Sequence, residues 1–101
     1  MIFIAHSLKF TDKAIEYEKS LGCKCYIPGR DTPQTTGEEI LEKNRQALID
    51  SNEVHVIWDG VSFGTLFDMG MAFGLNMPVK IIDVIPQSWT TYALSKKGKY
   101  L

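Results

Sequence analysis

The sequence predicts an α/β fold: a flavodoxin-like or Rossmann-like three-layer sandwich on a small parallel sheet, in one domain over 1–101. Two observations predict it. Four apolar runs have the length of strands, and they lie at 2–5, 23–27, 54–58 and 79–85. The stretches between these runs carry the capping residues and the one-sided apolar spacing of helices. Because strand and helix alternate and crossovers are right-handed, we expect the strand order 2-1-3-4, which a strand from the tail could extend to 2-1-3-4-5.

The composition suits one soluble domain and restricts its partners. The chain has 101 residues, of which 45% are hydrophobic and 23% charged, and its formal net charge is −1. A protein that binds polymeric nucleic acid normally has a basic excess, so we expect no such partner. No apolar segment is long enough to span a bilayer and the amino terminus does not resemble a signal peptide, so we expect a cytoplasmic protein without membrane contact.

Two polar residues, His6 and Ser7, directly follow the first strand. In an open α/β sheet the carboxyl ends of the central strands border the ligand crevice, so both residues are candidates for ligand binding. An ordinary loop histidine explains His6 equally well, because the sequence identifies no partner for it.

An amphipathic helix is predicted over 11–21, with Thr11 as a candidate N-cap and Gly22 as the left-handed residue that ends it. Cys23 and Cys25 follow on the second strand, where residues two apart make poor disulfide geometry. We therefore expect both cysteines to be reduced packing residues. The two histidines have no recognisable ligand spacing with them, so we expect no metal site and no cofactor.

The segment 28–36, PGRDTPQTT, is rich in turn formers and predicts a loop. Arg30 and Asp31 are its candidate ligand-binding residues, because a guanidinium can pair with phosphate or stack on a base, and a carboxylate beside it can accept hydrogen bonds. A solvated connection explains them equally well. Thr36 and Glu39 form a capping box that begins the next helix. The expected buried stripe of that helix is Ile40, Leu41, Ala47 and Leu48.

The most informative stretch lies between 54 and 80. An apolar strand ends at Asp59, and the following helix, 64–76, has Asp68 as its only ionisable side chain. Such a helix is apolar nearly all round, so we expect it to be covered on every side. A small sheet covers only one face, and we therefore expect a homo-oligomer through 64–77. Glycines in this helix, Gly70 and Gly74, predict close approach of a neighbouring element.

The loop and first turn of this helix supply a cluster of candidate site residues. Asp68 has two readings. With Thr65 it resembles a capping box, in which an acid near the helix N-terminus is also favoured by the helix dipole. Alternatively it lies one turn inside a ligand crevice at the carboxyl end of the third strand. On the second reading the candidate catalytic residues are Asp68 and Asp59, and the candidate binding residues are Gly60, Ser62, Gly64 and Thr65.

The run D-G-x-S-x-G-T-x-F-D-x-G-x-A-x-G-x-x-x-P-V, from Asp59 to Val79, resembles the signature of the nucleoside 2-deoxyribosyltransferase superfamily, which includes deoxynucleoside 5′-monophosphate N-glycosidases. In that family the position that matches Asp68 is usually Glu and is the nucleophile; here it is shorter by one methylene. The resemblance implies an N-glycosidic enzyme that acts on a 2′-deoxyribonucleoside or its 5′-monophosphate, by hydrolysis or by deoxyribosyl transfer. Asp59 would hold the ligand or orient Asp68.

The resemblance also implies a role for two serines. The family uses the first loop, here with Ser7, around the sugar and its 5′ group. Ser62 stands where transferases of free nucleosides commonly carry an acid and the monophosphate hydrolases a serine, which favours a monophosphate. Two other functions stay open: a non-catalytic module of the same fold that binds or senses a nucleotide, and an interaction protein without a small ligand.

Overall fold

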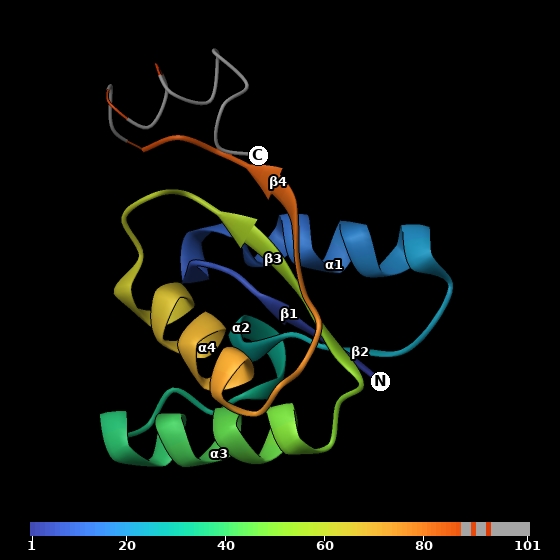
Figure 1. Ribbon diagram of the computed structural model, residues 1–101, viewed down its shortest axis with the longest axis vertical. Coiled ribbons are helices and arrows are strands. Elements are labelled where there is room, and N and C mark those ends of the chain that lie inside the picture. Colours follow the sequence, from blue (N-terminus) through green and yellow to red (C-terminus); the bar gives the residue numbers. More distant parts are fainter. Residues whose placement is uncertain (88–89, 91–92, 94–101) are drawn as a thin grey trace.

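The protein folds around a sheet of four parallel strands, with helices on both faces (Figure 1). A computed structural model describes residues 1–87, Thr90 and Ala93. The sheet has the predicted flavodoxin-like order β2-β1-β3-β4. Its strands are β1 (Ile2–Ala5), β2 (Cys25–Tyr26), β3 (Glu53–Trp58) and β4 (Val79–Val84).

Helical segments connect the strands and form the outer two layers of the sandwich. Helix α1 covers one face of the sheet, whereas α3 and α4 lie side by side on the other (Figure 1). The segments are a 3-10 turn η1 (Leu8–Phe10), α1 (Thr11–Leu21), a short α2 (Pro28–Asp31), α3 (Gly37–Ile49) and α4 (Phe63–Gly74).

Each face of the sheet buries its own apolar cluster. In β1, Phe3 and Ala5 point toward α3 and α4, and Ile4 points toward α1. This alternation follows from the two-residue period of a strand. Because both of its faces are covered, the central strand β1 is apolar throughout, as expected for a parallel sheet.

The segment around β2 departs from two predictions. The strand expected over 23–27 is reduced to Cys25–Tyr26, and Cys25 is buried whereas Cys23 is exposed, so only one thiol packs. The loop expected over 28–36 begins with the helical turn α2. Pro28 occupies the first position of that turn, where its fixed φ and missing N–H suit a helix, and the Asp31 carboxylate accepts the Ile27 N–H at 2.8 Å.

The beginning of α1 also differs from the prediction. Its N-cap is Phe10 rather than Thr11, because the 3-10 turn η1 precedes the helix directly. The Thr11 hydroxyl donates to the Leu8 carbonyl at 2.6 Å and so is used within the turn. The end of α1 is as predicted, since Gly22 is left-handed with a φ of 69°.

Helix α3 begins where the sequence predicts, but the set of residues that it buries differs from the predicted one. The Thr36 hydroxyl accepts the Glu39 N–H at 3.2 Å, which confirms the N-cap. Ala47 and Leu48 are buried, but Leu41 is 42% exposed and Asn44 is buried in its place. The buried side of this helix therefore contains one polar residue, Asn44, among its apolar ones.

Helix α4 begins at Phe63, and its N-cap is Ser62 rather than Thr65. The Ser62 hydroxyl accepts the Thr65 N–H, while Thr65 itself lies inside the first turn and is 1% exposed. The capping-box reading of Thr65 and Asp68 is thereby excluded. The close approach predicted at Gly70 and Gly74 does not occur among the described residues, since a Cβ at either position meets nothing within 4 Å there.

Strand β4 forms an edge of the sheet, as its polar residues Lys80 and Asp83 predict. Its pairing with β3 shifts register after Val56, which pairs with Ile81, so that Ile57 pairs with Asp83. The fifth strand considered for the tail lies outside the described residues. No helix in the part of the chain that the structure describes is long and apolar enough to cross a membrane.

Candidate functional site

A cavity of about 350 Å³ lies at the carboxyl edge of the sheet, where β1 and β3 end side by side. The chain leaves β1 toward α1 on one face and leaves β3 toward α4 on the other, which opens the sheet at this point. Five of the predicted site residues line the cavity: His6, Ser7, Ser62, Gly64 and Asp68. The remaining lining comes from Leu8, Pro28, Gln34, Ile40, Leu41 and Asn44.

The loop after β3 is held by Asp59. This residue is 1% exposed, and its Oδ1 accepts the backbone N–H groups of Val61 at 3.0 Å and of Ser62 at 2.8 Å. Gly60 supplies the left-handed turn that this arrangement needs, with a φ of 82°. Asp59 and Gly60 do not line the cavity in the described structure; they position the serine that does.

Ser62 lies at the cavity, and its hydroxyl proton has no acceptor among the described residues. Its oxygen accepts from the Thr65 N–H at 3.2 Å and from the Thr65 hydroxyl at 2.9 Å. The Ser62 hydroxyl proton is therefore free to be donated to a ligand. The Thr65 amide is occupied by this cap, so the amide available in the first turn beside the cavity is that of Gly64.

Asp68 faces the cavity from the second turn of α4 and is 5% exposed. Burial raises the pKa of Asp68 to about 7, because the charged carboxylate loses its hydration. The Asn44 amide partly opposes this rise by favouring the ionised form. A carboxyl group that titrates near neutral pH in a cavity is a common mark of a functional site.

A chain of hydrogen bonds orients Asn44. The Thr32 hydroxyl donates to Asn44 Oδ1 at 2.7 Å, and the Tyr26 and Thr32 oxygens are 2.5 Å apart. Since the Thr32 proton is given to Asn44, the Tyr26 hydroxyl donates to Thr32. With its oxygen occupied, Asn44 presents its NH₂ group to the Asp68 carboxyl.

His6 lines the cavity, but both of its ring nitrogens are engaged by the backbone. Nδ1 lies 2.8 Å from the Ser7 carbonyl and Nε2 accepts the Gly29 N–H at 3.2 Å, which fixes a neutral ring with its proton on Nδ1. Burial lowers the pKa of His6, and the bond to Ser7 opposes the shift only in part. His6 therefore fastens α2 to the end of β1 and presents ring atoms, rather than a charge, to the cavity.

Arg30 and Asp31 do not line the cavity. Arg30 donates to Glu18 of α1 at 2.7 Å and to Asp31 at 2.8 Å, so its charge is used to hold α2 against α1. The bond from Arg30, followed by that from the Cys25 N–H, lowers the pKa of Glu18. This network joins three charged side chains in a solvent-accessible position and does not line the cavity.

The residues that the sequence reading missed come mainly from α3. Asn44 stands four residues after Ile40 and four before Leu48, at the centre of an apolar stripe. A polar residue in the middle of an apolar stripe is often buried and hydrogen-bonded, so this position in the sequence could have identified Asn44 as a candidate. No sequence feature could have identified Gln34 or Leu41 as site residues. Gln34 lies in a segment predicted only as a polar loop, and Leu41 lies on the predicted apolar face of a helix.

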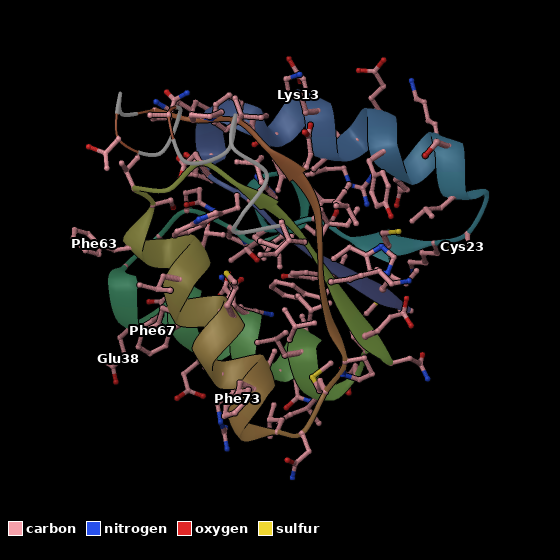
Figure 2. The ribbon with its side chains drawn as sticks, turned by 45° about the horizontal axis from the view of Figure 1, so that its top comes forward. Lys13, Cys23, Glu38, Phe63, Phe67 and Phe73 are labelled. Atoms are coloured by element: carbon pink, nitrogen blue, oxygen red, sulfur yellow. The ribbon has the colours of Figure 1, made fainter. Side chains whose placement is uncertain are left out.

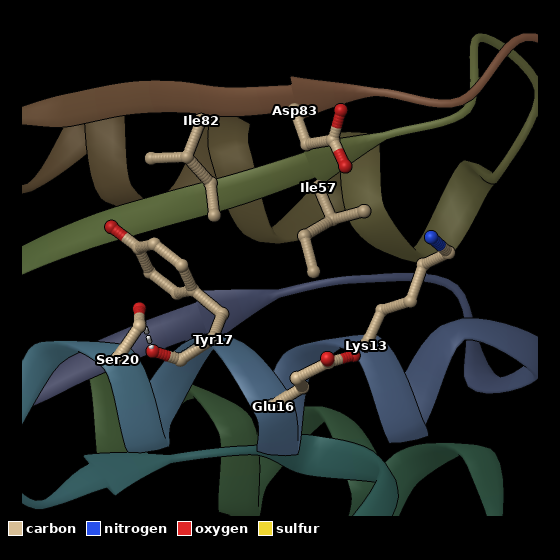
Figure 3. A pocket seen from close by; sticks show the side chains of 7 residues that line it. All are labelled: Lys13, Glu16, Tyr17, Ser20, Ile57, Ile82 and Asp83. Atoms are coloured by element: carbon tan, nitrogen blue, oxygen red, sulfur yellow. Dashed lines mark hydrogen bonds between the residues drawn. The ribbon is translucent and has the colours of Figure 1, made fainter.

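A second cavity, of about 270 Å³, opens on the other face of the sheet between α1 and β4 (Figure 3). Ile57 and Ile82 form its floor, and Lys13, Glu16 and Asp83 stand around it. Tyr17 lies at its edge, but its hydroxyl is bonded to His55 Nδ1 at 2.6 Å. His55 is buried in β3 and bonded to Glu53 through its other nitrogen, as expected for a structural histidine.

Within the described ranges, no group of three or more His, Cys, Asp or Glu side chains is placed to hold a metal ion. The sequence matches no protein-family model, and a search of curated proteins found no match. The chemistry of the first cavity therefore has to be argued from its own side chains.

Proposed function

We propose that the protein is an N-glycosidic enzyme that acts on a 2′-deoxyribonucleoside 5′-monophosphate, with Asp68 as the nucleophile. The observation that carries the proposal is the position of Asp68: a buried carboxyl, in a cavity at the carboxyl ends of β1 and β3, beside the Ser62 hydroxyl. The similarity of 59–79 to the nucleoside 2-deoxyribosyltransferase signature gives the substrate class. A cavity of about 350 Å³ has the volume of an ordinary small-molecule site.

In the proposed reaction the bond between C1′ and the base nitrogen breaks, and its electron pair leaves with the base. Positive charge then develops on the sugar ring, and the Asp68 carboxylate stabilises it and forms a bond to C1′. The departing base takes a proton from solvent. Water, or the nitrogen of another base, subsequently attacks C1′ and releases Asp68 as a carboxylate, which gives hydrolysis or transfer respectively.

The polar groups around Asp68 support a phosphate at the 5′ end. The Ser62 hydroxyl and the Gly64 N–H are donors at the N-terminus of α4, where the helix dipole favours an anion. The Ser7 hydroxyl faces the same cavity from the end of β1. An acid in place of Ser62 would repel a phosphate and favour a free 5′-hydroxyl.

Asp68 is a shorter nucleophile than Glu, and the missing methylene removes about 1.5 Å of reach, which can lower a rate about a hundredfold unless the substrate lies closer. The apolar wall of Leu8, Pro28, Ile40 and Leu41 faces α4 across the cavity and can hold the base and sugar toward Asp68. Asn44 keeps a donor beside the carboxyl, which favours the ionised, nucleophilic form.

The alternative function is a module of the same fold that binds or senses a nucleotide without cleaving it. The raised pKa of Asp68, about 7, favours this alternative, because near neutral pH a large share of the molecules hold a protonated carboxyl, which is no nucleophile. A protonated Asp68 would act as a hydrogen-bond donor to a bound sugar or base.

The two functions are separated by incubating pure protein with the four deoxynucleosides and their 5′-monophosphates. Free base is measured by chromatography and binding by calorimetry, both at pH 8, where Asp68 is mostly ionised. Release of base from a monophosphate supports the enzyme, and binding without release supports the module. If none of the eight compounds binds or reacts, both functions are wrong.

A further inference from the structure

The second cavity, of about 270 Å³, lies on the opposite face of the sheet from α3 and α4 (Figure 3). Helix α1 packs on this face, and Figure 2 shows its Lys13 on the other side of the molecule from Phe73 of α4. Beside α1, the part of the sheet formed by β3 and β4 remains accessible, and Ile57 and Ile82 line the cavity there. The site proposed for catalysis therefore does not use this cavity.

A β-bulge in β4 directs two successive side chains into this cavity. Val56 of β3 pairs with Ile81. The next residue, Ile57, pairs with Asp83, so Ile82 is an extra residue without a partner in β3. In a regular strand Ile82 and Asp83 would point to opposite faces of the sheet. Because of the bulge both line the same cavity, and bulges are common beside ligand sites, where they redirect a side chain.

The charged side chains around the cavity are not paired with one another. Lys13 and Glu16 reach the cavity from α1, and Asp83 reaches it from β4 (Figure 3). None of the three forms an ion pair within 4.0 Å with a residue in the part of the chain that the structure describes. An ammonium group and a carboxylate thus border the same space from opposite walls. A ligand that carries one charge of each sign can contact both.

The cavity has a charged end and an apolar end. Lys13 and Asp83 lie toward one end, whereas the Tyr17 ring and Ile82 lie toward the other (Figure 3). Ile57, which is 2% exposed, lies between the two ends. The Tyr17 hydroxyl is already hydrogen-bonded within the protein at 2.6 Å, so Tyr17 offers its ring surface to a ligand. A molecule that fits this arrangement has both charges at one end and an apolar group at the other.

We propose that this cavity binds a free α-amino acid with an apolar side chain, such as leucine. The ligand's carboxylate pairs with Lys13 and its ammonium group pairs with Asp83, while its side chain packs between Tyr17 and Ile82. Glu16 adds a second carboxylate, which further favours an ammonium group. The volume of about 270 Å³ lies just below the range of drug-sized pockets, about 300–1,000 Å³, and suits a smaller molecule. The proposal does not depend on the proposed enzymatic activity.

The first test is a titration of the natural chain with L-leucine, followed by NMR of the isoleucine methyl groups. The resonances of Ile57 and Ile82 should shift, and those of Ile40, which lines the first cavity, should not. Glycine lacks the apolar side chain and should bind about tenfold more weakly or worse. N-acetyl-L-leucine and L-leucinamide each lack one charge and should bind about threefold more weakly or worse. No shift at tens of millimolar leucine, or equal affinity for all four compounds, would overturn the proposal.

The second test matches each charged side chain with the ligand group that it contacts. Lys13→Gln should weaken binding of L-leucine but not of L-leucinamide, which has no carboxylate to lose. Asp83→Asn should weaken binding of L-leucine but not of N-acetyl-L-leucine, which has no ammonium group. Both residues are solvent-exposed, so neither variant should unfold. Asp50→Asn, at an exposed position of α3 outside the cavity, is the matched control and should leave every affinity unchanged. If Asp83→Asn weakens both leucine compounds equally, or weakens neither, the proposal is wrong.

Discussion

The Thr32 hydroxyl donates a 2.7 Å hydrogen bond to Asn44 Oδ1, and this bond determines which end of the Asn44 amide faces Asp68. Thr32 is 3% exposed and Asn44 is 6% exposed, so neither side chain can exchange its partner freely for water. An amide that flipped would present an oxygen to the carboxyl and disfavour its ionisation. Asn44 of α3 thus influences the ionisation of Asp68 of α4, which lines the cavity.

Replacing Asn44 by leucine should raise the pKa of Asp68 above its present value of about 7, because the donor that favours the ionised form is removed. The change can be followed by infrared absorption of the protonated carboxyl as a function of pH. Thr32→Val serves as a second variant: it leaves Asn44 in place but frees its orientation, and should shift the same titration in the same direction by less. An unchanged titration in both variants would contradict the role given to Asn44.

Asp68 should also reduce the stability of the protein at neutral pH. Its pKa rises from an ordinary 3.8 to about 7 on folding, so the folded state holds a proton that the unfolded state has lost between these values. The stability of the natural chain is therefore greatest, with respect to this group, below about pH 4 and is lost as the pH rises through about 7. About three pKa units correspond to at most about 4 kcal/mol.

The measurement is urea unfolding of the natural chain and of Asp68→Asn between pH 4 and pH 9. The variant should gain stability relative to the natural chain as the pH rises to about 7, and the difference should then stay constant. A difference that does not vary with pH would show that Asp68 is not raised in the folded state.

The sheet order and the crevice were predictable from the sequence because they depend on features with a fixed period. Alternating apolar runs and helical stretches give the order 2-1-3-4, and the positions after Ala5 and Trp58 then meet at one edge. The roles of individual polar residues depended on partners distant in the sequence. Arg30 could be expected at a phosphate as readily as at Glu18, since twelve residues separate it from its partner and no local pattern reports the contact.

The sequence also did not predict which glycines lie close to a neighbouring element. Sequence reasoning placed close contacts at Gly70 and Gly74, whereas among the described residues a close contact occurs at Gly29, where a Cβ would lie 2.1 Å from Thr11 Oγ1 and 2.8 Å from His6 Cε1. Gly29 sits in a segment whose helical turn was not predicted. Its crowding results from the packing of α2 on α1, which only the tertiary structure defines.

Gly29→Ala should therefore destabilise the protein by roughly 1–3 kcal/mol, the usual cost of overpacking. Gly37→Ala is the matched control, because it also lies in a first helical turn and a Cβ there meets nothing within 4 Å. Thermal unfolding of the two variants should show a lowered midpoint for the first and an unchanged or raised midpoint for the second. Equal midpoints would mean that α2 shifts to accommodate the added methyl group without loss of stability, which would contradict the prediction.

Substitutions of Ser62 should separate its capping role from its proposed contact with phosphate. Ser62→Ala removes the cap of α4 and should cost about 1 kcal/mol of stability. Ser62→Asp can keep the cap, since its carboxylate can accept the same N–H, but places a negative charge where the phosphate is proposed to bind. Calorimetry should show that Ser62→Asp loses affinity for a deoxynucleoside 5′-monophosphate and retains affinity for the deoxynucleoside. Equal affinity for both ligands in this variant would contradict the phosphate site.

The pH dependence of base release should follow the ionisation of Asp68. A nucleophile must be deprotonated, so kcat should rise as the pH increases through about 7 and level off above it. The profile is measured with a saturating deoxynucleoside 5′-monophosphate between pH 5 and pH 9. A rate that falls over this range would assign Asp68 the role of a proton donor instead.

The most direct test of the account is the comparison of Asp68→Asn with the natural chain in one assay of base release and ligand binding at pH 8. Asparagine is nearly isosteric with aspartate and cannot form the covalent bond to C1′. We predict that release of base from a deoxynucleoside 5′-monophosphate falls about a thousandfold or more while binding of the same compound persists. Turnover that survives in Asp68→Asn would show that Asp68 is not the nucleophile and would contradict the mechanism.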